Sequence, residues 1–201
     1  MWIGWTQNWP WLTAVDDWLL AVMHSASVAN PLWITSWNVF CTVLGPTAFR
    51  LVGVGVIIWL LNRRELRAAL FLVVSLELSG LVTTAAKLLA NRDRPSTAMV
   101  HAFGSSFPSG HALSVLVAVL ALLTVILPRL VPRWRAPLIV TGVAVVVLIG
   151  FGRVALNVHH PSDVVAGWAL GYIWYLVCLL AVRPAAVTAA SERPAAPDNS
   201  L

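Results

Sequence analysis

The feature that most constrains this sequence is a series of apolar runs, each close to the ~20 residues that a helix needs to cross a bilayer. The runs cover residues 46–62, 67–90, 111–128, 136–156 and 163–182. Of the 201 residues, 59% are hydrophobic and only 10% are charged, more apolar sequence than a soluble core of this size needs. The sequence therefore predicts an all-α fold, an integral membrane helical bundle with about five transmembrane helices.

Residues 1–45 form a distinct N-terminal segment that contains no Lys or Arg. Seven of the 11 tryptophans lie in it: Trp2, Trp5, Trp9, Trp11, Trp18, Trp33 and Trp37. Because indole rings favour the membrane–water boundary, we expect interfacial helices over 14–28 and 31–44. The alternative is a sixth span over 18–44, against which the Asn-Pro pair at 30–31 argues. Without a basic start the segment does not resemble a signal peptide, so we expect it to be retained.

The remaining composition bounds the domain and its partners. Residues 184–201, rich in Ala and Pro, are predicted to form a disordered cytoplasmic tail, which leaves one membrane-embedded domain over 1–183. Cys41 and Cys178 fall at different depths, so no disulfide is expected. The net charge is +5, but the 12 arginines among the 13 cations are scattered, and we expect no nucleic-acid partner.

The arginines also predict an orientation. If the spans alternate, one side of the membrane holds Arg63, Arg64, Arg67, Arg129, Arg133, Arg135, Arg183 and Arg193. By the positive-inside rule that side is cytoplasmic, as is the C-terminus of this multi-pass plasma-membrane protein. The opposite side holds Lys87, Arg92, Arg94 and Arg153. A bound anion would explain why these cations lie on the side that the positive-inside rule disfavours. We therefore expect an anion-binding site on the extracytoplasmic side.

Three polar islands interrupt the apolar runs on that opposite side. The first contains Lys87, the only lysine of the chain, and Arg94 followed by Pro95. A separation of seven residues is two helical turns, so both cations are expected to point to one site at the end of the second span. The alternative is a snorkelling lysine and an unrelated loop arginine.

The second island is Pro108-Ser109-Gly110-His111, directly before the third span. Ser109 is a suitable N-cap, and Gly110 allows backbone N–H groups to approach a ligand closely. The unpaired amides and the dipole of a helix N-terminus favour an anion. A capped helix with an incidental histidine is the alternative, but it does not account for His111.

The third island joins the last two spans. Arg153 ends the fourth span, and His159 falls in a turn because Pro161 starts the next helix. Asp163 is either a helix-capping acid alone or the acceptor of the Nδ1 proton of His159, which leaves Nε2 free to attack. His160 is the less expected nucleophile, because it directly precedes the proline.

In order and in spacing, these islands resemble the three signature motifs of the type 2 phosphatidic acid phosphatase (PAP2) superfamily. The matching motifs are Lys87-x6-Arg94-Pro95, Pro108-Ser109-Gly110-His111 and Arg153-x5-His159-x3-Asp163. The resemblance covers about residues 87–163, and the helical pattern extends it to about 182. Three motifs in register make it specific.

The resemblance implies a membrane lipid phosphatase. In that family the residue matching His159 attacks phosphorus to give a phosphohistidine, the one matching Asp163 orients it, and the one matching His111 protonates the leaving group. The phosphoryl oxygens are bound by the residues matching Lys87, Arg94, Ser109, Gly110 and Arg153. No metal or other cofactor is required, and the lone Asp93 gives no reason to expect a metal pair.

The sequence departs from the family pattern in three respects. Gly152 stands where serine is usual, and His160 stands where an aromatic residue is more common. The first of the six spans found in many relatives is also missing, so we expect the tryptophan-rich helices to form the lipid entrance. None of these changes removes a named catalytic group.

For the substrate we expect a lipid phosphate or diphosphate, most of all a polyprenyl (undecaprenyl or decaprenyl) diphosphate, with membrane lipids as partners. The alternative is a phosphatidic acid or phosphatidylglycerophosphate phosphatase. An inactive lipid-phosphate-binding membrane protein is the alternative of another class, although it should have lost His159, His111 or Asp163. Vanadate-dependent haloperoxidases share the anion pocket but are soluble. Gly167-x3-Gly171 could mark a homodimer face, while packing within the chain is its simpler use.

Overall fold

The computed structural model describes residues 1–184, which form an all-helical chain; residues 185–201, and with them most of the predicted tail, lie outside the described residues. The helices are α1 (Trp2–Thr6), α2 (Pro10–Ala29), α3 (Pro31–Val43), α4 (Pro46–Asn62), α5 (Leu66–Ala90), α6 (Gly110–Ile126), the short 3-10 helix η1 (Leu127–Arg129), α7 (Pro132–Ala155) and α8 (Pro161–Val182).

Proline marks the start of five helices: Pro10, Pro31, Pro46, Pro132 and Pro161. Its fixed φ suits the first turn, where the missing N–H would have no helical partner. Asn30 separates α2 from α3 in an extended conformation, and its side chain accepts the N–H of Leu32 at 3.0 Å. A single helix over 18–44 is thereby excluded, and the predicted break at 30–31 is confirmed.

Within residues 1–184, five stretches are long and apolar enough to cross a membrane, and this confirms the predicted number. They are Pro31–Asn62, Leu66–Ala90, Gly110–Arg129, Pro132–Ala155 and Pro161–Val182. The first is longer than the predicted 46–62, because α3 leads into α4 with only Leu44 and Gly45 between them. Large apolar side chains such as Leu51, Leu81, Val140 and Leu180 are exposed on these stretches, as a lipid environment allows.

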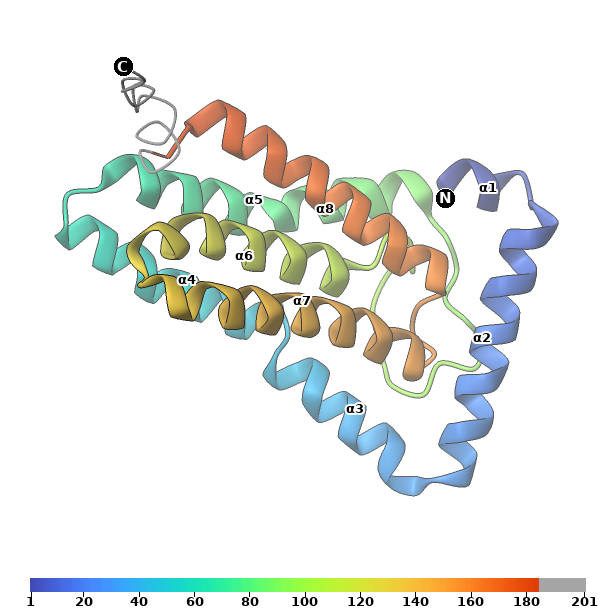
Figure 1. Cartoon of the computed structure of the whole chain (residues 1–201). Helices are drawn as coiled ribbons and strands as arrows, with labels where there is room; N and C mark the ends of the chain where they lie inside the picture. Colours follow the sequence, from blue (N-terminus) through green and yellow to red (C-terminus); the bar gives the residue numbers. More distant parts are fainter. Residues whose placement is uncertain (185–201) are drawn as a thin grey trace, which may run out of the picture.

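Helix α6 lies within the bundle, beside α5, α7 and α8 (Figure 1). Its contact with α8 depends on small residues. A Cβ at Gly167 would lie 2.6 Å from the carbonyl oxygen of Ser109, and one at Gly171 would lie 3.0 Å from that of Leu113. These two glycines therefore serve close packing within the chain.

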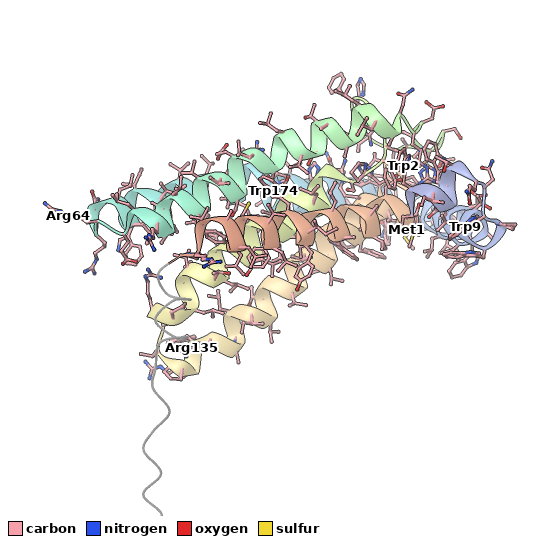
Figure 2. All side chains as sticks on the ribbon, turned by 90° about the horizontal axis from the view of Figure 1, so that it is seen from above. Met1, Trp2, Trp9, Arg64, Arg135 and Trp174 are labelled. Carbon is pink, nitrogen blue, oxygen red and sulfur yellow. The ribbon has the colours of Figure 1, made fainter. Side chains whose placement is uncertain are left out.

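Helix α2 lies across one end of the bundle at a steep angle to the other long helices, and α3 runs obliquely back to α4 (Figure 1). Hydrogen bonds hold both helices in place: Asn157 donates Nδ2–H to the carbonyl of Leu20 at 3.1 Å, and Trp33 donates Nε1–H to that of Ala155 at 3.0 Å. We call this end of the bundle the α2 end. Arg64 and Arg135 lie toward the opposite end, away from Trp2 (Figure 2).

Candidate active site

The first polar island lies where α5 ends. Lys87 is in the last turn, and Asn91 ends the helix in the left-handed conformation (φ 47°), so Arg94 stands in the loop beyond. The prediction that the two cations lie two turns apart on one helix is therefore wrong. They converge through the loop instead, because the Ser105 carbonyl accepts hydrogen bonds from Lys87 Nζ and from Arg94 Nη2, the latter at 3.4 Å.

Backbone carbonyls hold the Arg94 guanidinium in place. Nε donates to Gly104 at 3.1 Å, Nη2 to Phe103 at 2.9 Å and Nη1 to Val158 at 2.7 Å. Nη1 also lies 3.4 Å from Nε2 of His159. Because neutral carbonyls fix the guanidinium, its charge remains available to an anion beside this imidazole.

The second island begins α6, with Ser109 at the N-cap position as predicted. The N–H of Ser109 donates to the carbonyl of Asp163 at 2.9 Å, which ties the start of α6 to the start of α8. A Cβ at Gly110 would lie 3.0 Å from the methyl of Thr83 and 4.0 Å from Cε of Lys87. Glycine thus allows the amides of this helix N-terminus to lie close to the lysine, where an anion is favoured by both.

The third island connects α7 to α8. Arg153 is buried in the last turn of α7, and Asn157 turns the chain in the left-handed conformation (φ 51°). His160 is the N-cap of α8, so His159 lies in the turn between the helices, as predicted. Glycine at 152 also has a packing reason, since a Cβ there would lie 2.6 Å from Sγ of Cys41 on α3.

Asp163 contacts both histidines of this turn and Arg92 of the loop after α5. Its Oδ1 accepts a hydrogen bond from Arg92 at 2.6 Å, and Oδ2 accepts the backbone N–H of His160 at 2.9 Å. Oδ2 also lies 3.6 Å from Nδ1 of His159 and 3.3 Å from Nδ1 of His160. The two expected roles are therefore compatible, because Asp163 caps α8 and also faces His159. At 3.6 Å the His159 contact is slightly longer than a hydrogen bond, and such contacts often tighten when substrate binds.

The environment of His159 favours a neutral ring. The side chain is 2% exposed, and burial lowers the pKa of the imidazole to about 4. Asp163 partly opposes this change, while Arg153 and Arg94 lower the pKa further. At neutral pH the ring therefore carries no proton on one of its nitrogens, which a nucleophile requires.

The eight residues expected in the site come together at the α2 end: Lys87, Arg94, Ser109, Gly110, His111, Arg153, His159 and Asp163. The three cations are close enough for their charges to act on His111, in the first turn of α6. Ser109 Oγ and Arg153 Nε are buried and have no hydrogen-bond partner among residues 1–184. Buried donors without partners cost free energy, so this cluster is suited to a ligand rich in acceptors, such as phosphate.

Sequence reasoning missed two charged residues beside the site. Arg92 contacts Asp163, and it also donates to Asp16 of α2 at 3.0 Å. The available signal was the position of Arg92 on the side opposite the arginine-rich loops. Its carboxylate partner lies 76 residues away in sequence, and no local spacing reveals such a pair.

A cavity of about 780 Å³ lies between α2 and the loop that follows α5. Leu20, Ala21 and His24 line it from α2, and Arg94 and His160 line it from the motif loops. Since Arg94 also lies beside His159, the cavity borders the cluster of cations. The space is therefore placed to admit part of a ligand to the site.

The fold and the site together define an integral membrane protein with a buried histidine set among three cations, an arrangement suited to a membrane phosphatase. Residues 68–186 match the PAP2 superfamily, more than half of the chain. The chain belongs to this superfamily and is a multi-pass membrane lipid phosphatase.

Relatives and a solved structure agree with this assignment. Phosphatidylglycerophosphatase B of Bacillus subtilis is 28% identical over 166 residues, 78% of this chain and 79% of that protein. An undecaprenyl-diphosphatase of Sulfolobus acidocaldarius is 41% identical over 66 residues, 33% of this chain and 28% of its own. A lipid A 1-phosphatase of Rhizobium etli is 33% identical over 114 residues, 50% of this chain and 44% of its own. In fold, the chain is similar to the crystal structure of a transmembrane PAP2-type phosphatidylglycerolphosphate phosphatase from Bacillus subtilis, with a TM-score of 0.68. The two sequences are 24% identical, and the match covers 82% of this chain and 84% of that one.

Proposed function

We propose that this phosphatase removes the terminal phosphate of a lipid phosphomonoester through a phosphohistidine on His159. The observation that carries the proposal is the buried imidazole of His159, whose Nε2 lies 3.4 Å from Nη1 of Arg94, in a cluster with two further cations and a helix N-terminus. A phosphoryl group carries most of its charge on the non-bridging oxygens, so fixed cations and amides stabilise it where the imidazole attacks.

The reaction follows in two displacements. Nε2 of His159 forms a bond to phosphorus as the bond to the lipid oxygen breaks, and His111 gives a proton to that leaving oxygen. Water then attacks the phosphohistidine, His111 accepts its proton, and phosphate is released with His159 restored. Asp163 holds the ring of His159 from the Nδ1 side throughout. The oxygens of the phosphoryl group are bound by Lys87, Arg94, Arg153, Ser109 and Gly110.

Phosphatidylglycerophosphate is the substrate we favour. The similarity to phosphatidylglycerophosphatase B extends over most of both chains, whereas the similarity to the undecaprenyl-diphosphatase covers 28% of that protein. The comparison therefore supports the phosphomonoester alternative better than the polyprenyl diphosphate that the sequence first suggested. The prenyl diphosphate remains the second candidate, because 41% identity in the shared segment is high.

The site opens on the extracytoplasmic side in this proposal. Arg64 and Arg135 lie toward the end of the bundle remote from α2 (Figure 2), and arginine-rich loops favour the cytoplasm. Helix α2 crosses the α2 end at a steep angle to the spans, as an interfacial helix would. A lipid phosphate then reaches the site from the headgroup layer by way of the cavity beside α2.

Phosphate release by the purified protein in detergent tests this function. The panel is phosphatidylglycerophosphate, phosphatidate and undecaprenyl diphosphate, with EDTA present throughout. We expect metal-independent release that is fastest from phosphatidylglycerophosphate and that His159→Ala abolishes, while His160→Ala lowers it only in part, because the backbone N–H of residue 160 still donates to Asp163. Equal release by the wild type and His159→Ala would refute the mechanism, and faster release from the prenyl diphosphate would reverse the order of substrates. No release by the wild type from any member of the panel would support the inactive lipid-binding alternative.

A further inference from the structure

Arg92 is an almost completely buried cation shared by two carboxylates. Its Nη1 donates to Oδ1 of Asp163 at 2.6 Å, and its Nη2 donates to Oδ2 of Asp16 at 3.0 Å. The side chains of Arg92, Asp16 and Asp163 are 6%, 2% and 0% exposed. The ring of Trp5 covers the guanidinium at 5.4 Å, so residues of α1 and α2 enclose a group that contacts the catalytic turn.

Asp16 also holds the first turn of α8. Its Oδ1 accepts the backbone N–H of Ser162 at 2.9 Å, and its Oδ2 accepts the hydroxyl of Ser162 at 2.5 Å. The hydroxyl of Ser162 accepts a hydrogen bond from Arg92 Nη1 at 2.8 Å. A carboxylate at this position satisfies an amide of the first helical turn and complements the helix dipole. Asp16 therefore fixes the residue directly before Asp163.

The charges of the group have a consequence for His159. Arg92 alone would neutralise Asp163, because the two are in direct contact and little water reaches them. With Asp16 present, one guanidinium is shared between two carboxylates, and the group keeps a net charge of −1 next to His159. Positive charge develops on the imidazole when Nε2 attacks phosphorus, so a negative neighbour on the Nδ1 side stabilises the transition state.

We propose that Asp16 is a positioning residue of the phosphatase reaction, which shares Arg92 so that Asp163 retains negative charge toward His159. The inference rests on the proposed nucleophilic role of His159. It makes the N-terminal helix α2, which lies outside the segment matched by the superfamily, part of the catalytic apparatus. Asp16 does not contact the reacting atoms and acts through Arg92 and Asp163.

The decisive comparison is between Asp16→Asn and the double variant Asp16→Asn/Arg92→Gln. The single substitution keeps the shape of the side chain but removes its charge, so that Arg92 neutralises Asp163. We therefore expect kcat to fall by about 10- to 100-fold, while KM changes by less than about threefold. The double variant restores the net charge of −1, and we expect its kcat to exceed that of the single variant. Glu77→Gln, which removes the charge of an exposed carboxylate in the middle of α5 and outside the cavity, is the matched control and should stay within about twofold of the wild type.

A purely structural role predicts that kcat and the melting temperature fall and recover together in the two variants, whereas the inference predicts that kcat recovers in the double variant without a matching recovery of the melting temperature. A kcat of Asp16→Asn within about twofold of the wild type, or a double variant slower than the single one, would overturn the inference. If Asp16→Asn is not recovered folded, the double variant carries the test. A kcat within about tenfold of the wild type then supports the inference, and a loss as complete as that of His159→Ala contradicts it. Retained activity in His159→Ala would instead refute the proposed function itself.

Discussion

At the scale of single residues, the proposed mechanism makes the protonation of His159 set the pH range in which the reaction can start. Burial lowers the pKa of the ring to about 4 from an ordinary value of 6.5. A lowered pKa means that the unprotonated, nucleophilic form persists as the pH falls through 6 and 5. We therefore expect that protonation of His159 lowers kcat/KM only when the pH falls to about 4.

The phosphate group of the substrate ionises at about pH 6, and this ionisation also changes kcat/KM with pH. Measuring kcat/KM against pH for two substrates with different phosphate pKa values separates the two ionisations. The decrease in kcat/KM that is caused by the enzyme occurs at the same pH for both substrates. A common acid limb near pH 6.5 would contradict the neutral, buried state of His159. The measurement uses the wild type in detergent, with protein integrity checked at each pH.

The residues of the three motifs could be predicted because each motif is local in sequence. Ser109, Gly110 and His111 are adjacent, and the turn between α7 and α8 is fixed by Pro161. Asp16 could not be predicted, since its role depends on a contact across 76 residues of sequence. The sequence also did not indicate that Asn91 would end α5 before Arg94, because asparagine only sometimes adopts the left-handed conformation.

At the scale of helices, the contact between α6 and α8 positions two of the three motifs. We expect Gly167→Ala to lower the melting temperature of the protein in detergent, with a loss of about 1–3 kcal/mol from overpacking, because the new Cβ would lie 2.6 Å from the Ser109 carbonyl. Phosphatase activity should fall as well, because the new Cβ would displace the backbone of Ser109, which belongs to the second motif.

Gly55→Ala on α4 is the matched control for this prediction. A Cβ at Gly55 would meet nothing within 4 Å, so alanine should leave the melting temperature unchanged or raise it slightly through its higher helix propensity. Equal effects of the two substitutions would show that the α6–α8 contact yields easily and does not fix the motifs.

The positions of the helices along the chain could be predicted from the sequence better than the angles between the helices. Apolar runs indicate where α4 to α8 lie, and prolines mark the starts of α4, α7 and α8, because both signals act within a few residues. The angle of α2 to the bundle depends on Asn157 donating to Leu20 and on Arg92 contacting Asp16, which are contacts between distant segments. The merging of α3 with α4 into one apolar stretch likewise depends on how Gly45 bends the chain.

At the scale of the whole molecule, the orientation in the membrane can be tested by labelling introduced cysteines. Both native cysteines, Cys41 and Cys178, are buried, which gives a low background. Ala98→Cys lies in the exposed loop at the α2 end, and Arg63→Cys lies after α4 toward the other end. We expect an impermeant maleimide to label Ala98→Cys on intact cells but Arg63→Cys only after permeabilisation. The reverse pattern would place the site in the cytoplasm.

The position of α2 across the α2 end has a consequence for how this enzyme can change. The same helix borders the cavity at its Leu20 face and supplies Asp16 to the charge group behind His159. A substitution that reshapes this helix to suit a different lipid headgroup would also disturb the speed of the chemical step. We therefore expect substrate selectivity and turnover to change together, so that exchanging the N-terminal segment between relatives transfers both properties or neither.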